Sequence, residues 1–180
     1  IRNGAVITCD PDLGTLARAD ILVRDGAIER VGPDISAPGF ETIDASDMIV
    51  MPGMIDTHYH MWSALGRNYL ADGFEYFPAK AATSAHYTPE DFYNSIMLAM
   101  AELANNGVTT VHNWAHNVRS PAHADAELRA HRDSFLRARY AYGHIDALAR
   151  DKPLDFTDIE RVRGEWFGAS SPLRGLVHLA

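Results

Sequence analysis

From residue 52 onward, strand-like apolar runs alternate with segments long enough to form helices, and no other feature constrains the fold so strongly. This alternation is typical of βα units and of a parallel sheet. The predicted strands are the run that ends at His60 and residues 108–112, 137–142 and 176–179. The predicted helices begin at Pro89, at Pro121 and near Asp158, where capping residues or apolar stripes at helical spacing occur.

These strands correspond to half of a closed barrel, since a (β/α)₈ barrel needs eight strands and roughly 250 residues. We therefore predict an α/β fold in which residues 52–180 form the N-terminal half of a (β/α)₈ TIM barrel. We expect a long loop over residues 67–87, and we expect Phe135 among the apolar positions of the second helix.

Residues 1–51 show a different pattern, with short strand-like runs and turn signals but no helix-length segment. We predict strands near residues 5–8, 20–24, 27–31, 42–44 and 48–51. The pair Asp25-Gly26 between two of these runs is typical of a tight β-hairpin. This region is expected to be a small β-sandwich segment that forms part of a composite domain, followed by the barrel from residue 52.

Two histidines stand on the same side of the first barrel strand, in the sequence Asp56-Thr57-His58-Tyr59-His60. Successive strand side chains face opposite ways, so His58 and His60 project together while Tyr59 points away. Two neutral imidazoles in this arrangement can bind one divalent cation at about 2.0 to 2.1 Å. An HxH pair alone also occurs on solvated strands without any ligand, so its apolar context matters to this prediction.

Composition excludes several classes of function. A net charge of −8 with scattered basic residues argues against nucleic acid as a partner. The sequence has no run of about eighteen apolar residues that could span a membrane. Cys9 is the only cysteine, which excludes an internal disulfide and fits a reducing compartment. We expect a cytoplasmic protein whose partner is a small molecule, without nucleic-acid or membrane binding.

The string PGMIDTHYHMW resembles the first barrel strand of the amidohydrolase superfamily. Together with IRNGAVIT, DILVRDGAIERVG and GVTTVHNWAHN, it resembles the order of parts in the cytosine deaminase and chlorohydrolase-like branch of these metal-dependent hydrolases. The resemblance covers nearly the whole chain. It implies that the N-terminal segment forms half of a β-sandwich and that His58 and His60 are metal ligands.

The resemblance also implies the chemistry. Members of this branch use one divalent metal, usually zinc or alternatively iron, to activate water that attacks C–N bonds of ring amidines and amides. Two-metal relatives use a lysine late on the fourth strand, and this chain has His178 there, which favours a single ion. The remaining ligands and the general acid and base are expected beyond Ala180. A homo-oligomer is one expectation for the full protein.

Other residues are candidates for substrate binding because they follow the metal strand or lie near the end of the second strand, where barrel active sites collect their loops. These candidates are Trp62, Arg67 and His116. A structural role is the alternative for each of them. Four further histidines with polar neighbours are expected at the surface: His86, His123, His131 and His144.

Two alternatives to C–N hydrolysis remain open at this stage. The same fold could hydrolyse an ester, a phosphotriester or a carbon–halogen bond. The chain could also belong to a metal-binding module that has no catalytic activity.

Overall fold

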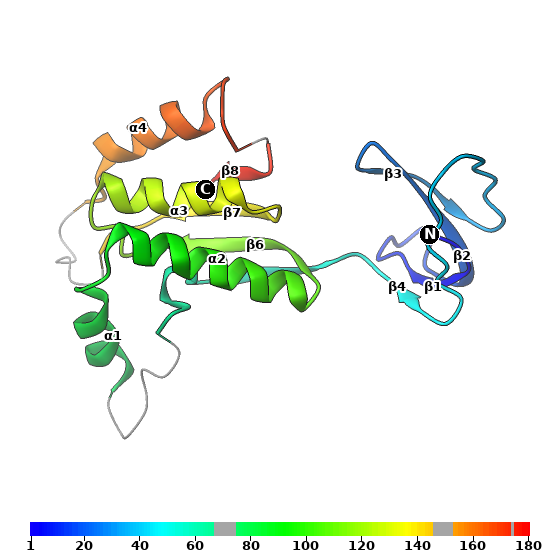
Figure 1. Cartoon of the computed structure of the whole chain (residues 1–180), viewed down its shortest axis with the longest axis horizontal. Helices are drawn as coiled ribbons and strands as arrows, with labels where there is room; N and C mark the ends of the chain where they lie inside the picture. Colours follow the sequence, from blue (N-terminus) through cyan, green and yellow to red (C-terminus); the bar gives the residue numbers. More distant parts are fainter. Residues whose placement is uncertain (67–74, 146–152, 174) are drawn as a thin grey trace. The chain divides into compact units, whose positions relative to one another are not determined.

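The structure is a computed structural model that describes residues 1–66, 75–145, 153–173 and 175–180. The chain divides into two compact units, unit one (Ile1–Gly53) and unit two (Met54–Ala180), and each is described by itself. Figure 1 shows the elements of both units in the order of the sequence.

Unit one is a four-stranded sheet in the order β3-β2-β1-β4. Its strands are β1 (Gly4–Ile7), β2 (Thr15–Arg24), β3 (Ala27–Gly32) and β4 (Ile49–Val50). The pairs β1–β2 and β2–β3 are antiparallel, whereas β1 and β4 are parallel. Asp25 and Gly26 form the predicted turn between β2 and β3, and both have positive φ angles, 51° and 77°, as a tight hairpin requires.

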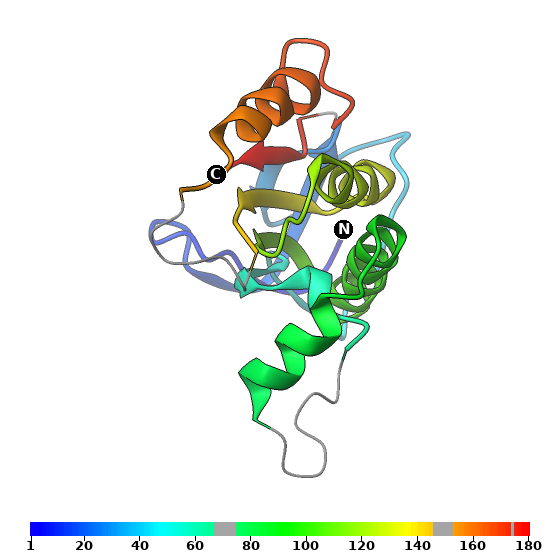
Figure 2. The same cartoon turned by 90° about the vertical axis from the view of Figure 1, so that its left-hand side faces the viewer.

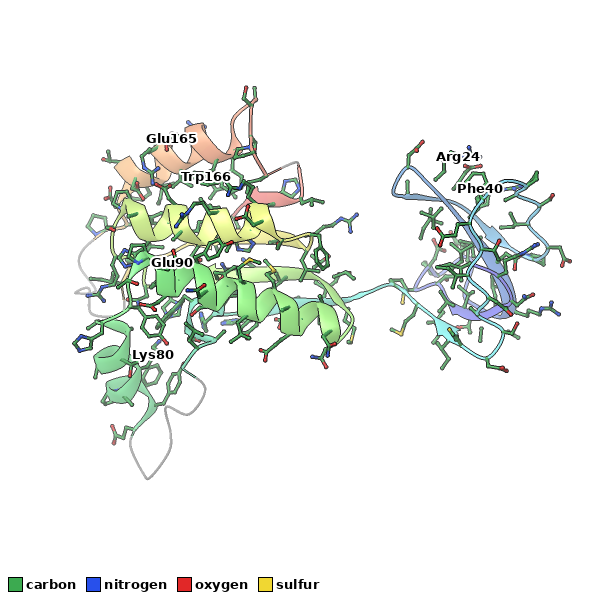
Figure 3. The ribbon with its side chains drawn as sticks, viewed as in Figure 1. Arg24, Phe40, Lys80, Glu90, Glu165 and Trp166 are labelled. Carbon is green, nitrogen blue, oxygen red and sulfur yellow. The ribbon has the colours of Figure 1, made fainter. Side chains whose placement is uncertain are left out.

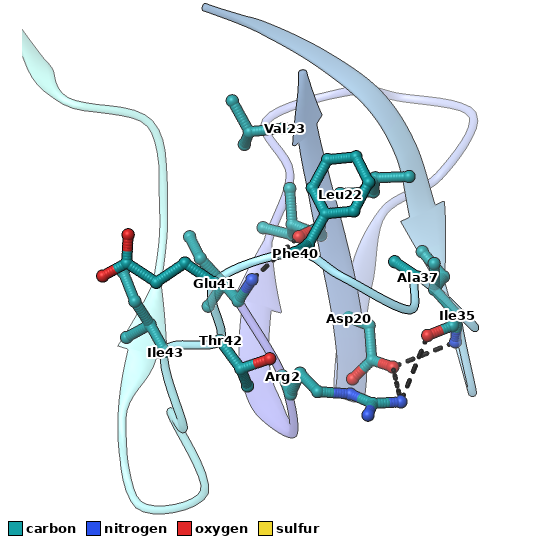
Figure 4. A pocket seen from close by; sticks show the side chains of 12 residues that line it. Arg2, Asp20, Leu22, Val23, Ile35, Ala37, Phe40, Glu41, Thr42 and Ile43 are labelled. Carbon is teal, nitrogen blue, oxygen red and sulfur yellow. Dashed lines mark hydrogen bonds and ion pairs between the residues drawn. The ribbon is translucent and has the colours of Figure 1, made fainter. Parts of the chain in front are cut away.

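Asp20 is a buried carboxylate within this sheet, and its oxygens are well satisfied. It accepts hydrogen bonds from the backbone N–H groups of Asn3 at 2.9 Å and Ile35 at 3.0 Å, and Arg2 lies 3.5 Å away. The bond from Asn3 is the largest cause that holds the pKa of Asp20 below its usual value. Figure 4 shows Arg2, Asp20 and Ile35 at one end of a cleft of about 400 Å³, and none of the predicted site residues lines it.

Unit two contains a parallel four-stranded sheet in the order β5-β6-β7-β8, with helices between the strands. The strands are β5 (Met54–Tyr59), β6 (Val108–Ala115), β7 (Arg137–Tyr142) and β8 (Val177–Leu179). The helices are α1 (Tyr76–Ser84), α2 (Pro89–Asn105), α3 (Pro121–Asp133) and α4 (Phe156–Phe167). This is the predicted α/β architecture with a parallel sheet, and the sheet is open, not closed into a barrel.

The helices α2, α3 and α4 lie on one face of this sheet, as the two views in Figures 1 and 2 show. The core of unit two forms between this face and the helices. Its buried members include Val111, Ala138 and Tyr140 from the strands and Ile96, Leu128 and Val162 from the helices. The opposite face of the sheet carries His112 and Trp114, because side chains alternate along β6.

Helix α2 begins where the sequence predicts it. The Thr88 hydroxyl accepts a hydrogen bond from the backbone N–H of Asp91, and the Asp91 carboxylate accepts one from the backbone N–H of Thr88. This reciprocal capping box satisfies two backbone donors that a helix start otherwise leaves unpaired. Pro89 occupies the first turn. Beyond the helix, Gly107 has a φ of 77°, which glycine adopts without strain.

Several sequence expectations are wrong in detail. Residues 76–84 form the helix α1, whereas a loop was expected there. α3 ends at Asp133, so Phe135 lies outside the helix and its side chain is 77% exposed. Residues 42–44 form no strand, and only an isolated bridge joins Asp44 to Arg2.

Among the described residues, no helix is long and apolar enough to cross a membrane.

Candidate metal centre

His58 and His60 lie where the first strand of unit two ends. β5 ends at Tyr59, so His58 belongs to the strand and His60 directly precedes the short 3₁₀ helix η1 (Met61–Ser63). The carboxylate of Asp56 accepts a hydrogen bond from the backbone N–H of His58 at 2.9 Å. The motif is therefore held by a strand on one side and by a helical turn on the other.

The two imidazole rings converge on one point. Their Nε2 atoms lie 3.2 Å apart, and the ring planes are nearly perpendicular, at 82°. Two ligands at about 2.0 to 2.1 Å from a tetrahedral zinc ion are separated by roughly 3.3 Å. The spacing of the two nitrogens therefore fits a pair of ligands on one ion, and it arises where β5 passes into η1.

The second ring nitrogen of His60 is also engaged. Nδ1 lies 3.3 Å from the backbone carbonyl oxygen of Trp114, and because a carbonyl only accepts, Nδ1–H is the donor. The neutral ring then has its lone pair on Nε2, the atom that faces His58. Burial is the largest cause that lowers the pKa of His60, followed by the charge of nearby His116. Both effects favour the neutral, ligand-competent imidazole.

Within the described residues, no group of three or more His, Cys, Asp or Glu side chains is arranged to hold a metal ion. A zinc site commonly has at least three protein ligands. The two histidines alone are therefore fewer than the ligands of a complete zinc site.

His116, a predicted substrate contact, lies beside the pair. Its ring meets that of His60 edge to face, with centroids 4.3 Å apart. The indole N–H of Trp62 donates to Nδ1 of His116 at 3.2 Å, and Nζ of Lys80 lies 3.2 Å from Nε2. His116 thus connects the helix α1, on which Figure 3 labels Lys80, with the histidine pair.

Trp62, another predicted substrate contact, is fully buried. It packs with Phe92 and Ala126 in a small apolar cluster, and its ring stacks on that of Phe92 at 5.8 Å. The structure therefore places its indole N–H, not an exposed ring face, toward His116. The third predicted contact, Arg67, lies outside the described residues.

Sequence reasoning did not identify Trp114 or Lys80 as site residues. Trp114 stacks on His58 and also on His112, with ring centroids 4.7 Å and 5.1 Å apart. Lys80 is a buried residue of α1, the helix that was predicted as a loop. The sequence did contain one signal for Trp114. It lies two residues after His112 on a strand, so both side chains must share one face of the sheet.

A buried polar cluster lies on the other face of β6, between the sheet and α3. The side-chain amide of Asn113 donates to Glu127 at 2.9 Å and contacts Nε2 of His131 at 3.1 Å. The expectation that His131 lies at the surface is wrong, since only 2% of the residue is exposed. Burial raises the pKa of Glu127 to about 8 and lowers the pKa of His131 to about 4, so both groups favour their neutral forms.

The sequence profile of the Amidohydrolase family matches residues 49–169, which include all of the candidate metal centre. The chain is 32% identical to a 5'-deoxyadenosine deaminase of Methanosarcina barkeri, covering 94% of this chain and 39% of the relative. It is 32% identical to a 5-methylthioadenosine/S-adenosylhomocysteine deaminase of Pyrococcus furiosus, covering 84% and 35%. The chain therefore spans well under half the length of these relatives.

Solved structures show the same fold. An atrazine chlorohydrolase from Arthrobacter aurescens, determined in complex with zinc, aligns with a TM-score of 0.75 at 22% identity, covering 99% of this chain and 45% of that chain. A guanine deaminase from C. acetobutylicum aligns with a TM-score of 0.66 at 17% identity, covering 98% and 44%. Taken with the profile match and the deaminase relatives, these findings show that the chain belongs to the amidohydrolase family.

Proposed function

We propose that this chain is part of a metal-dependent hydrolase that cleaves C–N bonds other than peptide bonds, with His58 and His60 as two of its metal ligands. The convergence of the two Nε2 atoms, 3.2 Å apart, carries this proposal. One divalent ion is proposed, zinc first and iron as the alternative, because imidazole nitrogens suit both. Such an ion supplies the Lewis acidity that makes water a nucleophile near neutral pH.

The proposed reaction is the deamination, or amide or amidine hydrolysis, of a nitrogen heterocycle. The relatives at 32% identity are deaminases of 5'-deoxyadenosine and of 5-methylthioadenosine and S-adenosylhomocysteine, which favours a purine that carries an amino group. In this reaction the oxygen of water bonds to the ring carbon, the bond from that carbon to the amino group breaks, and the products are the oxo heterocycle and ammonia.

Three residues of this chain are proposed for substrate binding: Arg67 and His116 by contact, and Trp62 through His116. For His116 the support is its position, edge to face with His60 at 4.3 Å. For Trp62 the support is indirect, because its ring is buried and its N–H holds His116. The further metal ligands and the general acid and base are proposed to lie outside these 180 residues, since the relatives are more than twice as long.

The proposed architecture assigns residues 1–51 to a β-sandwich and residues 52–180 to the first half of a TIM barrel. The parallel order β5-β6-β7-β8 with helices on one face supports the barrel half. We further propose a cytoplasmic enzyme, and a homo-oligomer as its assembly. Its partner is a small molecule, and the net charge of −8 supports the absence of a nucleic-acid partner.

The test compares the full-length protein with a His58→Ala, His60→Ala double variant. Metal content is measured by elemental analysis, and ammonia release is measured over a panel of aminopurines, adenine nucleosides and ring amidines. We expect about one equivalent of zinc or iron in the parent protein, and its loss together with ammonia release in the variant, because two of its ligands are gone.

Equal metal content in both proteins would contradict the assignment of His58 and His60. Metal binding that depends on these histidines, with no ammonia release, would favour hydrolysis of another bond or a protein without catalytic activity. The panel therefore includes an ester, a phosphotriester and a chlorinated triazine. Turnover of one of these would replace C–N hydrolysis, and turnover of none would favour a metal-binding protein without catalysis.

A further inference from the structure

We propose that Trp114 is a positioning residue that holds both histidines of the metal pair, His60 through its backbone carbonyl and His58 through its indole. This inference rests on the proposed function, because it takes His58 and His60 to be metal ligands. It adds a residue whose side chain does not bind the ion and that the HxH motif does not include.

The contact with His60 uses the backbone of Trp114. The carbonyl oxygen accepts from Nδ1–H of His60 at 3.3 Å, although the two residues are 54 positions apart in the sequence. A ligand histidine whose second nitrogen donates to a fixed acceptor has its tautomer and ring orientation set before the ion binds. The same carbonyl accepts a hydrogen bond from the backbone N–H of His116 at 2.8 Å, and β6 pairs with β5 on one side and β7 on the other, so the carbonyl is held in place.

The contact with His58 uses the side chain. The indole and the imidazole are stacked, with centroids 4.7 Å apart and planes at 16°. The indole N–H also donates to the backbone carbonyl of Thr57 at 3.4 Å, which anchors the ring to the residue before His58. The other ring contact of His58 is the edge contact with His60, with centroids 4.9 Å apart, so the stack on Trp114 is the contact that supports the face of this imidazole.

The fold explains why a tryptophan at this position reaches both histidines. Asn113 and Ala115 on either side of Trp114 are fully buried on the helix-covered face of the sheet, so Trp114 is directed to the opposite face. The pairing of Tyr59 with Asn113 places Trp114 beside the end of β5. His112, two residues earlier on the same face, stacks on the indole at 5.1 Å and 28°.

The competing role for Trp114, which is 40% exposed beside the histidine pair, is a wall of the substrate pocket. The two roles predict different measurements. A positioning residue changes the affinity for the metal itself, measured without substrate. A pocket wall changes KM for the substrate and leaves metal affinity unchanged.

The experiment measures Zn²⁺ affinity of the full-length protein by competition with a chromogenic chelator, and the visible spectrum of the Co²⁺-substituted protein. The variants are Trp114→Leu, which removes the stack, and Trp114→Phe, which keeps a flat ring but loses the N–H. Both keep the backbone carbonyl. Trp166→Leu is the matched control, because that indole lies on α4 and bonds to Asp125.

We expect Trp114→Leu to weaken Zn²⁺ binding by about 10-fold, the lower end of the loss found when a hydrogen-bonded partner of a metal ligand is removed, since only the stack is lost. The Co²⁺ spectrum should change with it. Trp114→Phe should retain most of the affinity, since an aromatic ring can still stack on His58. Trp166→Leu should bind Zn²⁺ as the parent protein does.

Wild-type Zn²⁺ affinity in Trp114→Leu, while His58→Ala loses the metal, would overturn this inference and leave the proposed function standing. An equal loss in Trp166→Leu would also overturn it, because the effect would then come from general destabilisation. Retention of the metal by His58→Ala would refute the proposed function, and the inference with it. The His58→Ala variant therefore distinguishes failure of this inference from failure of the proposed function.

Discussion

At the scale of single residues, the buried pair Glu127 and His131 gives the protein a marked dependence on pH. Each side chain is fully enclosed between β6 and α3 and shares the amide of Asn113. The pKa of Glu127 is raised from 4.5 to about 8, whereas the pKa of His131 is lowered from 6.5 to about 4, in both cases mainly by burial. The two groups therefore change the stability in opposite directions as the pH rises, over windows that overlap between pH 4.5 and 6.5.

The direction in which the free energy of unfolding changes with pH depends on whether the folded or the unfolded state binds more protons. Between pH 4.5 and about 8, folded Glu127 keeps a proton that the unfolded chain releases, so the free energy of unfolding falls as pH rises. The slope from one such group reaches about 1.4 kcal/mol per pH unit. Below pH 6.5 the unfolded chain protonates His131 while the folded protein does not until about pH 4, so stability also falls as the pH is lowered.

We expect Glu127→Gln to remove the loss of stability toward high pH, which comes from Glu127, and to keep the loss toward low pH, which comes from His131. Glutamine has nearly the same shape, cannot ionise, and can still accept from Asn113. Urea unfolding measured from pH 6.5 to 8, above the window in which His131 acts, should show a flatter profile for the variant, which becomes the more stable protein toward pH 8 by a few kcal/mol. Parallel profiles for the two proteins would show that Glu127 is already ionised in the folded state.

At the scale of elements, the position of His116 depends on how closely the ends of β6 and β7 approach each other. Gly143 directly follows β7, and its backbone N–H donates to the carbonyl of Ala115 at 3.0 Å. A Cβ atom at this position would lie 2.9 Å from the Cα of His116 and 3.0 Å from its Cβ. The backbone of His116 cannot move aside as a flexible side chain could.

We therefore expect Gly143→Ala to displace His116 and with it the contact to His60. The variant should be destabilised by about 1 to 3 kcal/mol, as overpacked positions typically are, and ammonia release should fall more than Zn²⁺ affinity. Thermal unfolding and kcat/KM together check this result. Gly164→Ala is the control, because a Cβ there meets nothing within 4 Å. Equal losses in the two variants would argue against the close contact at His116.

The elements also show what a sequence can and cannot reveal. The parallel βα order of unit two was predictable because apolar periodicity and capping residues such as Thr88 and Pro89 are local signals. The placement of His58 and His60 on the same side was predictable from strand alternation, whereas the turn into η1 after His60 was not. α1 was missed since it begins without a side-chain cap and carries Pro78 within its first turn.

The parts of the site that escaped prediction depend on contacts between distant segments. Trp114 contacts His60, which is 54 residues away in the sequence, and Lys80 contacts His116, which is 36 residues away. Neither distance leaves a periodic signal in the sequence. His131 was misplaced for the same reason, because its partner Asn113 lies on another element and a polar residue with polar neighbours usually faces water.

At the scale of the whole molecule, the proposed metal ion should stabilise the folded state, because the two imidazoles converge only when β5 and η1 are formed. A ligand that binds only the folded protein adds about 2.7 kcal/mol of stability at one hundred times its Kd. We expect Zn²⁺ to raise the Tm of the metal-free full-length protein and a chelator to lower the Tm again. The His58→Ala, His60→Ala variant should show neither shift.

The strand order of unit two has a consequence for how the protein acquires its site as it folds. Each strand pairs with the one that precedes it in the sequence, so the sheet can grow by adding one strand at a time. His58 lies on the first of these strands, His60 just after it, and Trp114 on the second. The histidine pair and the residue that holds it can therefore be in place as soon as β6 docks on β5, while the ribosome is still adding the rest of the chain.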